Sequence, residues 1–296
     1  MNRAVSSLLA SLVDYAGLFP PAQLGMEAAV ARYAAHRRSA EGWMLARFVV
    51  PATRLGEFWV AATEHVSEPA PAGPWRLAAL LGADVAADAA RVTAFNTAHL
   101  QRALVDTVEL KAGTVEEIER ASSAVPRDLA TYVELPLSAD LTPLLRAVRA
   151  RHARAKIRTG GVVPEAIPAT ADLAAFLVAC AAARVPFKAT AGLHHAVRGR
   201  RSLTYAAGAP HGTMHGFLNV FAAATLAWDG VGAAEVEAVL GEERPDAFRW
   251  RDDGLAVGDR LLETEKLARA RTEFAMSFGS CSFDEPVADL RAMGVL

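Results

Sequence analysis

Short apolar runs alternate with longer amphipathic segments along most of the 296-residue chain. Apolar runs rich in β-branched side chains are typical of buried parallel strands, and the segments between them supply the crossover helices. The pattern predicts strands at residues 12–17 (a run that also fits a helix end), 44–50, 76–81, 104–110, 130–135, 155–159 and 186–191. It predicts helices between them at 26–36, 55–66, 85–99, 115–124, 141–151 and 170–184.

Beyond residue 191 this alternation breaks. A glycine-rich segment leads to helices predicted at 217–228 and 233–240, and FRWRDDGLAVGD (248–259) is typical of a hairpin because Asp253-Gly254 is a turn signal between two β-like runs. A helix at 261–271, an eighth strand at 273–278 and a closing helix at 286–293 complete the pattern.

Eight strand–helix units predict a single-domain α/β fold, the (β/α)8 barrel, with an extended connection after strand seven at about 198–260. This connection is long enough to cover the pocket of the barrel. An open, doubly wound sheet is the alternative, but neither a G-x-G-x-x-G nor a P-loop motif supports it.

The composition excludes several classes of protein. With 52% hydrophobic residues and a net charge of −2, the chain is neither disordered nor a general nucleic-acid binder. Cys180 and Cys281 make no disulfide framework, the start of the chain lacks the pattern of a secretory signal, and the longest apolar runs fall short of a membrane span. We therefore expect a soluble, cytoplasmic protein with no nucleic-acid and no membrane partner, and a homo-oligomer is compatible with the fold.

Lysine is scarce in this chain. It supplies four of the 31 basic residues, and arginine supplies the other 27. In a (β/α)8 barrel the chemistry lies at the C-terminal ends of the strands, and Lys156 and Lys188 fall inside predicted strands six and seven. Burying an ammonium group is costly unless it is paired or gives up its proton.

Two interpretations of these lysines remain open. In the structural one, they pair with Asp106 or Glu134 inside the barrel. In the catalytic one, a desolvated lysine beside a second cation has a lowered pKa, so that its neutral amine attacks a carbonyl and forms a Schiff base. Arginine cannot substitute in that chemistry because its guanidinium stays protonated.

The two lysines lie in short motifs, AKIRTGG and, 32 residues later, FKATAGLHH. This pair resembles the strand-six and strand-seven elements of the deoxyribose-phosphate aldolase family, class I aldolases with a (β/α)8 barrel. The resemblance implies that Lys156 forms a Schiff base with a small aldehyde or keto substrate and that Lys188 is the cationic neighbour that lowers its pKa. It implies a carbon–carbon lyase that needs neither a metal nor a cofactor.

The resemblance extends to other strand ends. SSLLASLVDYAGL is similar to the opening of the family and places Asp14 at its early aspartate, and LVDTVEL is similar to the fourth strand and places Asp106 at its proton-relay aspartate. The resemblance thus implies that Asp14 and Asp106 are catalytic and relay protons through water. SFGSCSF is similar to the phosphate-binding turn, which it places at Gly279, Ser280 and Ser282.

Two residues beside the Schiff-base position are further candidates for substrate binding. Arg158 alternates with Lys156 along strand six, so both are expected to face the interior. Arg158 is expected to bind a substrate carboxylate or phosphate, or else to pair with Glu134. Thr159, in the same motif, is a further expected substrate contact.

Three departures from the family pattern predict a changed substrate that need not be phosphorylated. The strand-five lysine of the relay falls at or near Thr131, the G-G-V-R turn after strand seven is replaced by AGLHH, and the connection at 198–260 is longer than its counterpart in the family.

The histidines supply a rival hypothesis. His194 and His195 follow strand seven, and His211 and His215 are four residues apart, which on a helix places them on one face, as in metal-binding pairs. These four residues would make a metal-dependent lyase or hydrolase. The glycines of HGTMHG argue against a continuous helix there, so we expect His194, His195 and His215 as substrate contacts or general acids instead. A barrel that binds a small molecule without catalysis is the remaining alternative.

Two further features are interpreted as structural. Cys281 precedes a helix whose N-terminus lowers the pKa of a thiol, but no clear base stands beside it, so we expect a packing residue. Glu109 and Lys111 share a strand face and are expected to form a surface pair.

Overall fold

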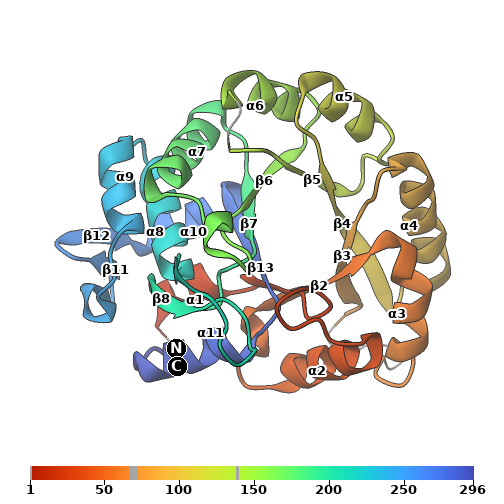
Figure 1. The fold of residues 1–296 in the computed structure, drawn as a ribbon, viewed down its shortest axis with the longest axis horizontal. Helices are drawn as coiled ribbons and strands as arrows, with labels where there is room; N and C mark the ends of the chain where they lie inside the picture. Colours follow the sequence, from red (N-terminus) through yellow and green to blue (C-terminus); the bar gives the residue numbers. More distant parts are fainter. Residues whose placement is uncertain (1, 67–72, 138–139) are drawn as a thin grey trace.

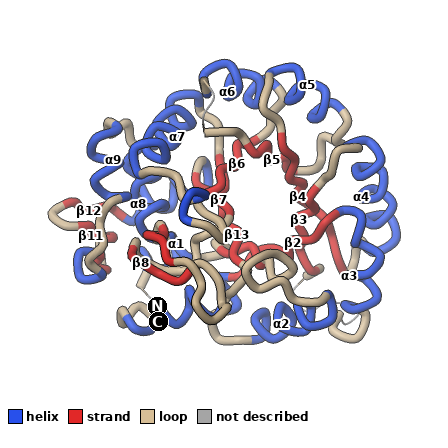
Figure 2. The backbone as a smooth tube through the Cα atoms, in the orientation of Figure 1, coloured by secondary structure: helices blue, strands red, loops and turns tan. Residues whose placement is uncertain are grey.

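The structure is a computed structural model that describes residues 2–66, 73–137 and 140–296. Eight parallel strands close into a barrel in the order β1-β13-β7-β6-β5-β4-β3-β2, with helices around it (Figures 1 and 2). The barrel strands are β1 (Val13–Tyr15), β2 (Leu45–Pro51), β3 (Trp75–Leu80), β4 (Ala103–Lys111), β5 (Ala130–Glu134), β6 (Arg154–Arg158), β7 (Phe187–Thr190) and β13 (Ala275–Ser280). The predicted (β/α)8 barrel is confirmed.

Helices follow the barrel strands and bury their apolar sides against them. The helices are α1 (Arg3–Leu9), α2 (Met26–Arg38), α3 (Leu55–Ala62), α4 (Val85–His99), α5 (Val115–Ser123), α6 (Leu141–Ala150), α7 (Thr170–Ala183), α8 (Phe217–Trp228), α9 (Ala233–Leu240), α10 (Thr264–Glu273) and α11 (Asp284–Ala292). Short 3-10 turns lie at Gly42–Met44, Ala52–Arg54, Pro164–Ala166 and Pro245–Ala247. Figure 1 places α9 and the strands β11 and β12 outside the ring, and the two chain ends side by side.

Most of the differences from the predicted elements lie after β7. The hairpin predicted at 248–259 is present as β10 (Phe248–Trp250) and β11 (Gly254–Val257), but a third strand, β12 (Arg260–Glu263), pairs with β11. The helix predicted at 261–271 therefore begins three residues later, at Thr264. The turn that admits β12 contains Gly258 with a positive φ of 58°, a conformation that glycine adopts without strain.

Two elements were not predicted. The first is α1, which begins at an Asn2 cap and buries Leu8 and Leu9. The second is a hairpin formed by β8 (Gly199–Ser202) and β9 (His211–Met214), which contributes Leu203 and Met214 to the lining of a cavity at the barrel mouth. Part of the long connection after β7 thus covers this cavity, as the sequence predicts.

One segment, Pro164–Ala183, is long and apolar enough to span a membrane by length and composition alone. It reaches that length only when the 3-10 turn at Pro164–Ala166 is counted together with α7. Helix α7 packs against α6, α8 and α9 in the outer layer, where buried side chains such as Phe176 and Leu177 face the barrel. Six of the 14 residues of α7 are buried in this packing.

A buried arginine links the segment that precedes β1 to the last strand of the barrel, β13. Arg271 in α10 donates hydrogen bonds to the backbone carbonyls of Leu8 and Ala10 near the chain start and of Ala275 and Met276 in β13. Burial lowers the pKa of Arg271 to about 10. These hydrogen bonds join the segment before β1 to the first residues of β13, the strand whose other end lines the cavity.

Candidate functional site

A cavity of about 230 Å³ lies at the C-terminal ends of the barrel strands. Its polar lining comes from Glu109 in β4, Lys156 and Arg158 in β6, and Lys188 in β7. The loop after β1 closes another side with Phe19 and two prolines, and the hairpin of β8 and β9 adds apolar side chains. The structure thus brings both predicted lysines into one enclosed space.

The centre of the site is a chain of alternating charges. The two carboxylate oxygens of Glu109 contact different lysines, at 2.7 Å from Lys156 Nζ and 2.6 Å from Lys188 Nζ. Lys156 Nζ also lies 2.9 Å from Glu134, and Lys188 Nζ also lies 2.6 Å from Asp14. All five residues are at most 9% exposed, so each charge depends on its neighbours rather than on water.

Strand register explains why these residues meet. In the parallel pairs, Lys156 lies opposite Lys188 across β6 and β7, and opposite Glu134 across β5 and β6. Residues that pair across parallel strands point to the same face of the sheet, which in a barrel is either the interior or the helix layer. The two lysines therefore both point into the barrel, and Glu109 from β4 contacts both ammonium groups.

The network fixes the charge states of its central members. Burial raises the pKa of Glu109, but Lys156 and Lys188 outweigh burial and hold that pKa at about 2. Burial alone would lower the pKa of Lys188, yet Asp14 and Glu109 hold it well above its usual value. Lys188 is therefore a permanent cation beside Lys156, which is the state that the resemblance implies for it.

Asp14 anchors the second lysine. Its carboxylate accepts hydrogen bonds from Lys188 and, at 2.7 Å, from the hydroxyl of Ser277, and the backbone N–H of Arg47 donates to its other oxygen at 3.1 Å. With its exposure at 1%, Asp14 holds Lys188 in place. It is not among the residues that line the cavity.

Asp106, predicted in the proton relay, is not brought to the lysines. Its carboxylate accepts hydrogen bonds from Arg47 at 2.6 and 2.9 Å and from Arg76 at 2.5 Å, two arginines near the starts of β2 and β3. The register of β3 and β4 shifts at this point, because Leu77 pairs with Val105 and the next residue with Thr107. This irregularity leaves Asp106 among the arginines, where it neutralises their charge.

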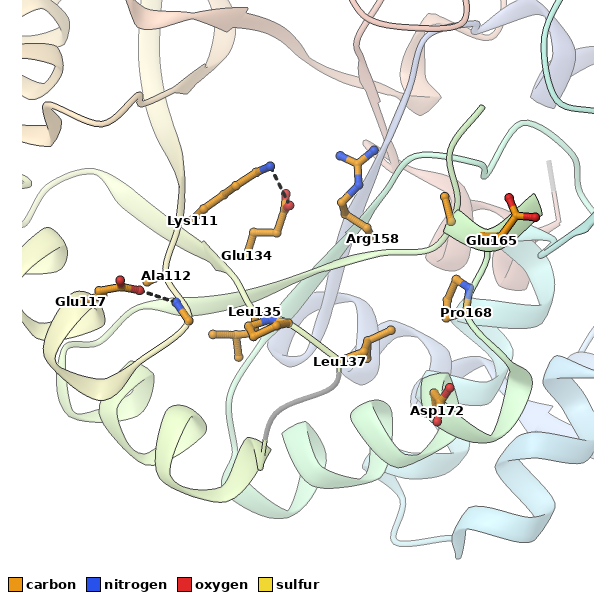
Figure 3. Close-up of a pocket in the computed structure, with 13 residues that line it drawn as sticks. Lys111, Ala112, Glu117, Glu134, Leu135, Leu137, Arg158, Glu165, Pro168 and Asp172 are labelled. Carbon is orange, nitrogen blue, oxygen red and sulfur yellow. Dashed lines mark hydrogen bonds and ion pairs between the residues drawn. The ribbon is translucent and has the colours of Figure 1, made fainter. Parts of the chain in front are cut away.

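A wider bowl of about 730 Å³ adjoins the cavity, and Arg158 lines both (Figure 3). Figure 3 shows the Lys111 amine and the Glu134 carboxylate pointing toward one another, at 3.5 Å. The predicted surface pair of Glu109 and Lys111 is wrong, since Glu109 is buried between the inner lysines. Within the described chain, no carboxylate lies within 4.0 Å of the guanidinium of Arg158.

The two serines expected to bind phosphate form hydrogen bonds with the backbone instead. The Ser280 hydroxyl accepts a hydrogen bond from the N–H of Ser282, and the Ser282 hydroxyl accepts one from the N–H of Glu285. Only Gly279 of the predicted turn residues lines the cavity. The helix that follows begins with the acidic pair Asp284 and Glu285, which repels an anion.

Thr159, predicted as a substrate contact, is fully buried. Its hydroxyl donates a hydrogen bond to the carbonyl of Ala191 at 2.6 Å. It therefore joins the ends of β6 and β7, where Gly160 and Gly192 also lie in close contact.

The four histidines do not converge. His195 contacts Asp289 at 3.1 Å, and His215 Nε2 lies 2.9 Å from the carbonyl of Pro168. His211 is exposed at the start of the strand β9, so the helical pair of the rival hypothesis is absent, as the glycines of HGTMHG indicate. Among the described residues, no group of three or more His, Cys, Asp or Glu side chains is arranged to hold a metal ion. Only His194 of the four lines the cavity.

Sequence reasoning missed two functional neighbours. Glu109 stands between Val108 and Leu110 in the predicted fourth strand, and a charged residue inside a short, buried-looking strand is the same signal that indicates a role for the lysines. Cys281, predicted to have no base beside it, lies 4.0 Å from both ring nitrogens of His194. That contact joins residues 87 positions apart, so only the fold reveals it.

Comparison with models of known protein families gives no match, and comparison with curated proteins gives none. The chemistry of the site therefore has to be argued from its own geometry.

The charge of Glu109 is expected to shape the acid stability of the protein. Its pKa is about 2 in the folded state against 4.5 for an unperturbed glutamate, so the carboxylate stabilises the fold above pH 4.5 and this contribution is lost as the pH falls toward 2. The shift corresponds to on the order of 3 kcal/mol. In Glu109→Gln, the fall in the free energy of unfolding between pH 4.5 and 2.5 should shrink by about 2 kcal/mol, since part of the contribution is lost only outside this range, as measured by urea denaturation.

Glu116→Gln is the control, because Glu116 is an exposed residue of α5. It should retain the acid dependence of the original protein. An unchanged slope in Glu109→Gln would show that the lysines do not stabilise the ionised form of Glu109.

Proposed function

We propose that this protein is a Schiff-base-forming lyase or aldolase that acts on a small aldehyde or keto substrate. The observation that carries the proposal is the pair Lys156 and Lys188, bridged by Glu109 at the lining of an enclosed cavity. The resemblance to the deoxyribose-phosphate aldolase family, drawn from short motifs, supports the same assignment.

Lys156 is the nucleophile in this proposal. It releases a proton, its amine adds to the carbonyl carbon, and loss of water leaves an iminium group. The iminium withdraws electrons from the neighbouring carbon, so that a bond to that carbon is broken or formed. Lys188 is unsuited to this role because Asp14 and Glu109 keep its amine protonated.

Lys188 and the carboxylates have supporting roles. A permanent cation next to Lys156 disfavours a second positive charge, whereas Glu109 and Glu134 stabilise that charge. Moving one carboxylate away from Lys156 therefore frees the amine for attack. Glu134 is the carboxylate suited to this movement, because it lies within ion-pair distance of both Lys156 and the exposed Lys111.

Arg158 points to a substrate with an acidic group. Lys156 and Lys188 each contact two carboxylates, whereas no carboxylate of the described chain lies within ion-pair distance of Arg158. Arg158 lines both the cavity and the bowl. A substrate carboxylate matches its planar guanidinium.

A phosphate is a poorer match to this site. The hydroxyls of Ser280 and Ser282 are engaged with the backbone, and the following helix begins with two acidic residues. We therefore infer a small carbonyl compound that carries a carboxylate rather than a phosphate, such as a 2-oxo acid.

Trapping of the iminium tests the proposed function. The protein is incubated with pyruvate, acetaldehyde or acetone and reduced with borohydride, and the adduct is mapped by mass spectrometry. We expect one adduct, on Lys156, and its complete loss in Lys156→Met. The matched control Lys266→Met removes an exposed lysine that pairs with Asp229, and it should leave the adduct unchanged. An adduct on other lysines only, or none with any carbonyl compound, would contradict the proposal.

The role of Arg158 is tested by comparing substrates. In Arg158→Gln, the pyruvate concentration that gives half-maximal trapping should rise roughly 10- to 100-fold, as expected for the loss of a charge-assisted hydrogen bond of about 1.5–3 kcal/mol. The value for acetone, which has no carboxylate, should change less than about 2-fold. An equal change for both compounds would show that Arg158 does not bind the carboxylate.

A further inference from the structure

A second reactive cluster faces the cavity that contains Lys156. It consists of His194 after β7, Cys281 after β13, Glu285 in the first turn of α11, and Tyr205 in the loop between β8 and β9. His194 and Cys281 both line the cavity. The cluster is separate from the lysine–carboxylate network, with which it shares no ion pair or hydrogen bond among the described residues.

The contacts orient the imidazole. His194 Nδ1 lies 2.9 Å from a Glu285 carboxylate oxygen, and the Tyr205 hydroxyl donates to that same oxygen at 2.9 Å. Cys281 Sγ lies 4.0 Å from both ring nitrogens and 3.8 Å from the Tyr205 hydroxyl. With Nδ1 engaged by Glu285, Nε2 is the nitrogen left for the cavity, in the arrangement of a carboxylate-oriented acid–base histidine.

Schiff-base chemistry requires a group that moves protons at the substrate. Among the titratable residues that line the cavity, Glu109 is held ionised, Lys188 is held protonated and Arg158 is permanently charged. Asp106, predicted for this task, is bound by two arginines. His194 and Cys281 are the lining groups that remain besides the nucleophile.

We propose that His194 is the general acid–base residue of this site, oriented by Glu285 and assisted by Cys281. The proposal rests on the function proposed above, since it assigns the proton transfers that accompany the Schiff base at Lys156.

Protons move between Lys156, His194 and the substrate in the following order. After Lys156 has released one proton to solvent and added to the carbonyl, the imidazolium Nε2 gives its proton to the carbinolamine hydroxyl, which leaves as water while the nitrogen lone pair forms the C=N bond. The neutral imidazole then accepts a proton from the carbon next to the iminium. The electrons of that C–H bond form a C=C bond, and the π electrons of the C=N bond return to the nitrogen as a lone pair, which gives an enamine. Return of the proton regenerates the iminium.

The surroundings of His194 favour the imidazolium form, in which the reaction sequence begins. Burial lowers the pKa of His194, but Cys281 and Glu285 outweigh burial and raise it to about 9. The groups that face the cluster from other elements are Tyr205 from the hairpin loop, Tyr15 from β1, and the cations Lys156, Arg158 and Lys188 across the cavity. The histidine is therefore a cation at neutral pH, able to donate first and accept afterwards.

Thiol reactivity tests the contact between His194 and Cys281 without any substrate. Iodoacetamide alkylation of the whole protein is followed by mass spectrometry between pH 5 and 10. His194→Asn should slow the alkylation of Cys281 at pH 7 by about 10-fold or more, because it removes the imidazole that contacts the thiol. Cys180 serves as an internal control, because it is fully buried and burial raises its pKa. An unchanged rate at Cys281 would overturn the pairing.

Solvent exchange tests the acid–base role. Pyruvate is incubated with the protein in heavy water, and loss of its methyl protons is followed by NMR. His194→Asn should slow the exchange by about 100-fold or more, while the amount of borohydride-trapped Lys156 at equilibrium stays within about 2-fold of the original protein. His152→Asn is the matched control, since His152 is exposed and has a positive φ that asparagine adopts readily.

The outcomes separate the two proposals. Trapping on Lys156 together with undiminished exchange in His194→Asn would overturn the role of His194 and leave the Schiff base intact. Absence of any adduct on Lys156 in the unmodified protein would overturn the proposed function and the role of His194 with it.

Discussion

The carboxylate of Glu109, held between two buried ammonium groups, is the interaction on which the site depends. An unpaired ammonium in the barrel interior would cost several kcal/mol, so Lys156 and Lys188 can lie side by side in the interior only because a carboxylate contacts both of them. Asp14 and Glu134 complete the neutralisation at either end. The ion pairs that the structural interpretation of the lysines required are thus present, and they are also what keeps two amines together at the barrel mouth.

The same network gives the two lysines different electrostatic surroundings. Lys188 is enclosed by carboxylates and stays charged, whereas Lys156 neighbours Glu134, which a surface lysine also contacts. Arg158 and His194 line the same cavity as this pair. A substrate that carries a carboxylate would therefore be bound at Arg158, attacked by Lys156 and protonated by His194.

The fold was predictable because strand and helix periods repeat along the chain. The two lysines were also predictable, since a charged residue inside a short apolar run signals a buried role. Glu109 carries the same signal within Val108 to Leu110, but pairing it with Lys111 relied on sequence proximity instead of strand register. Asp106 was misplaced because an irregular register cannot be read from a sequence, and the contact of Cys281 with His194 depends on how β7 and β13 pair.

The scarcity of lysine allows the central claim, that Lys156 is the reactive amine beside a permanently charged Lys188, to be tested in one experiment. In protein labelled with nitrogen-15 at the lysine side chains, the four amine signals can be assigned by substitution and followed by NMR as pyruvate is added. The account predicts that the Lys156 signal is replaced by that of an iminium while the Lys188 signal remains that of an ammonium group. Loss of the Lys188 signal, or persistence of all four, would contradict it.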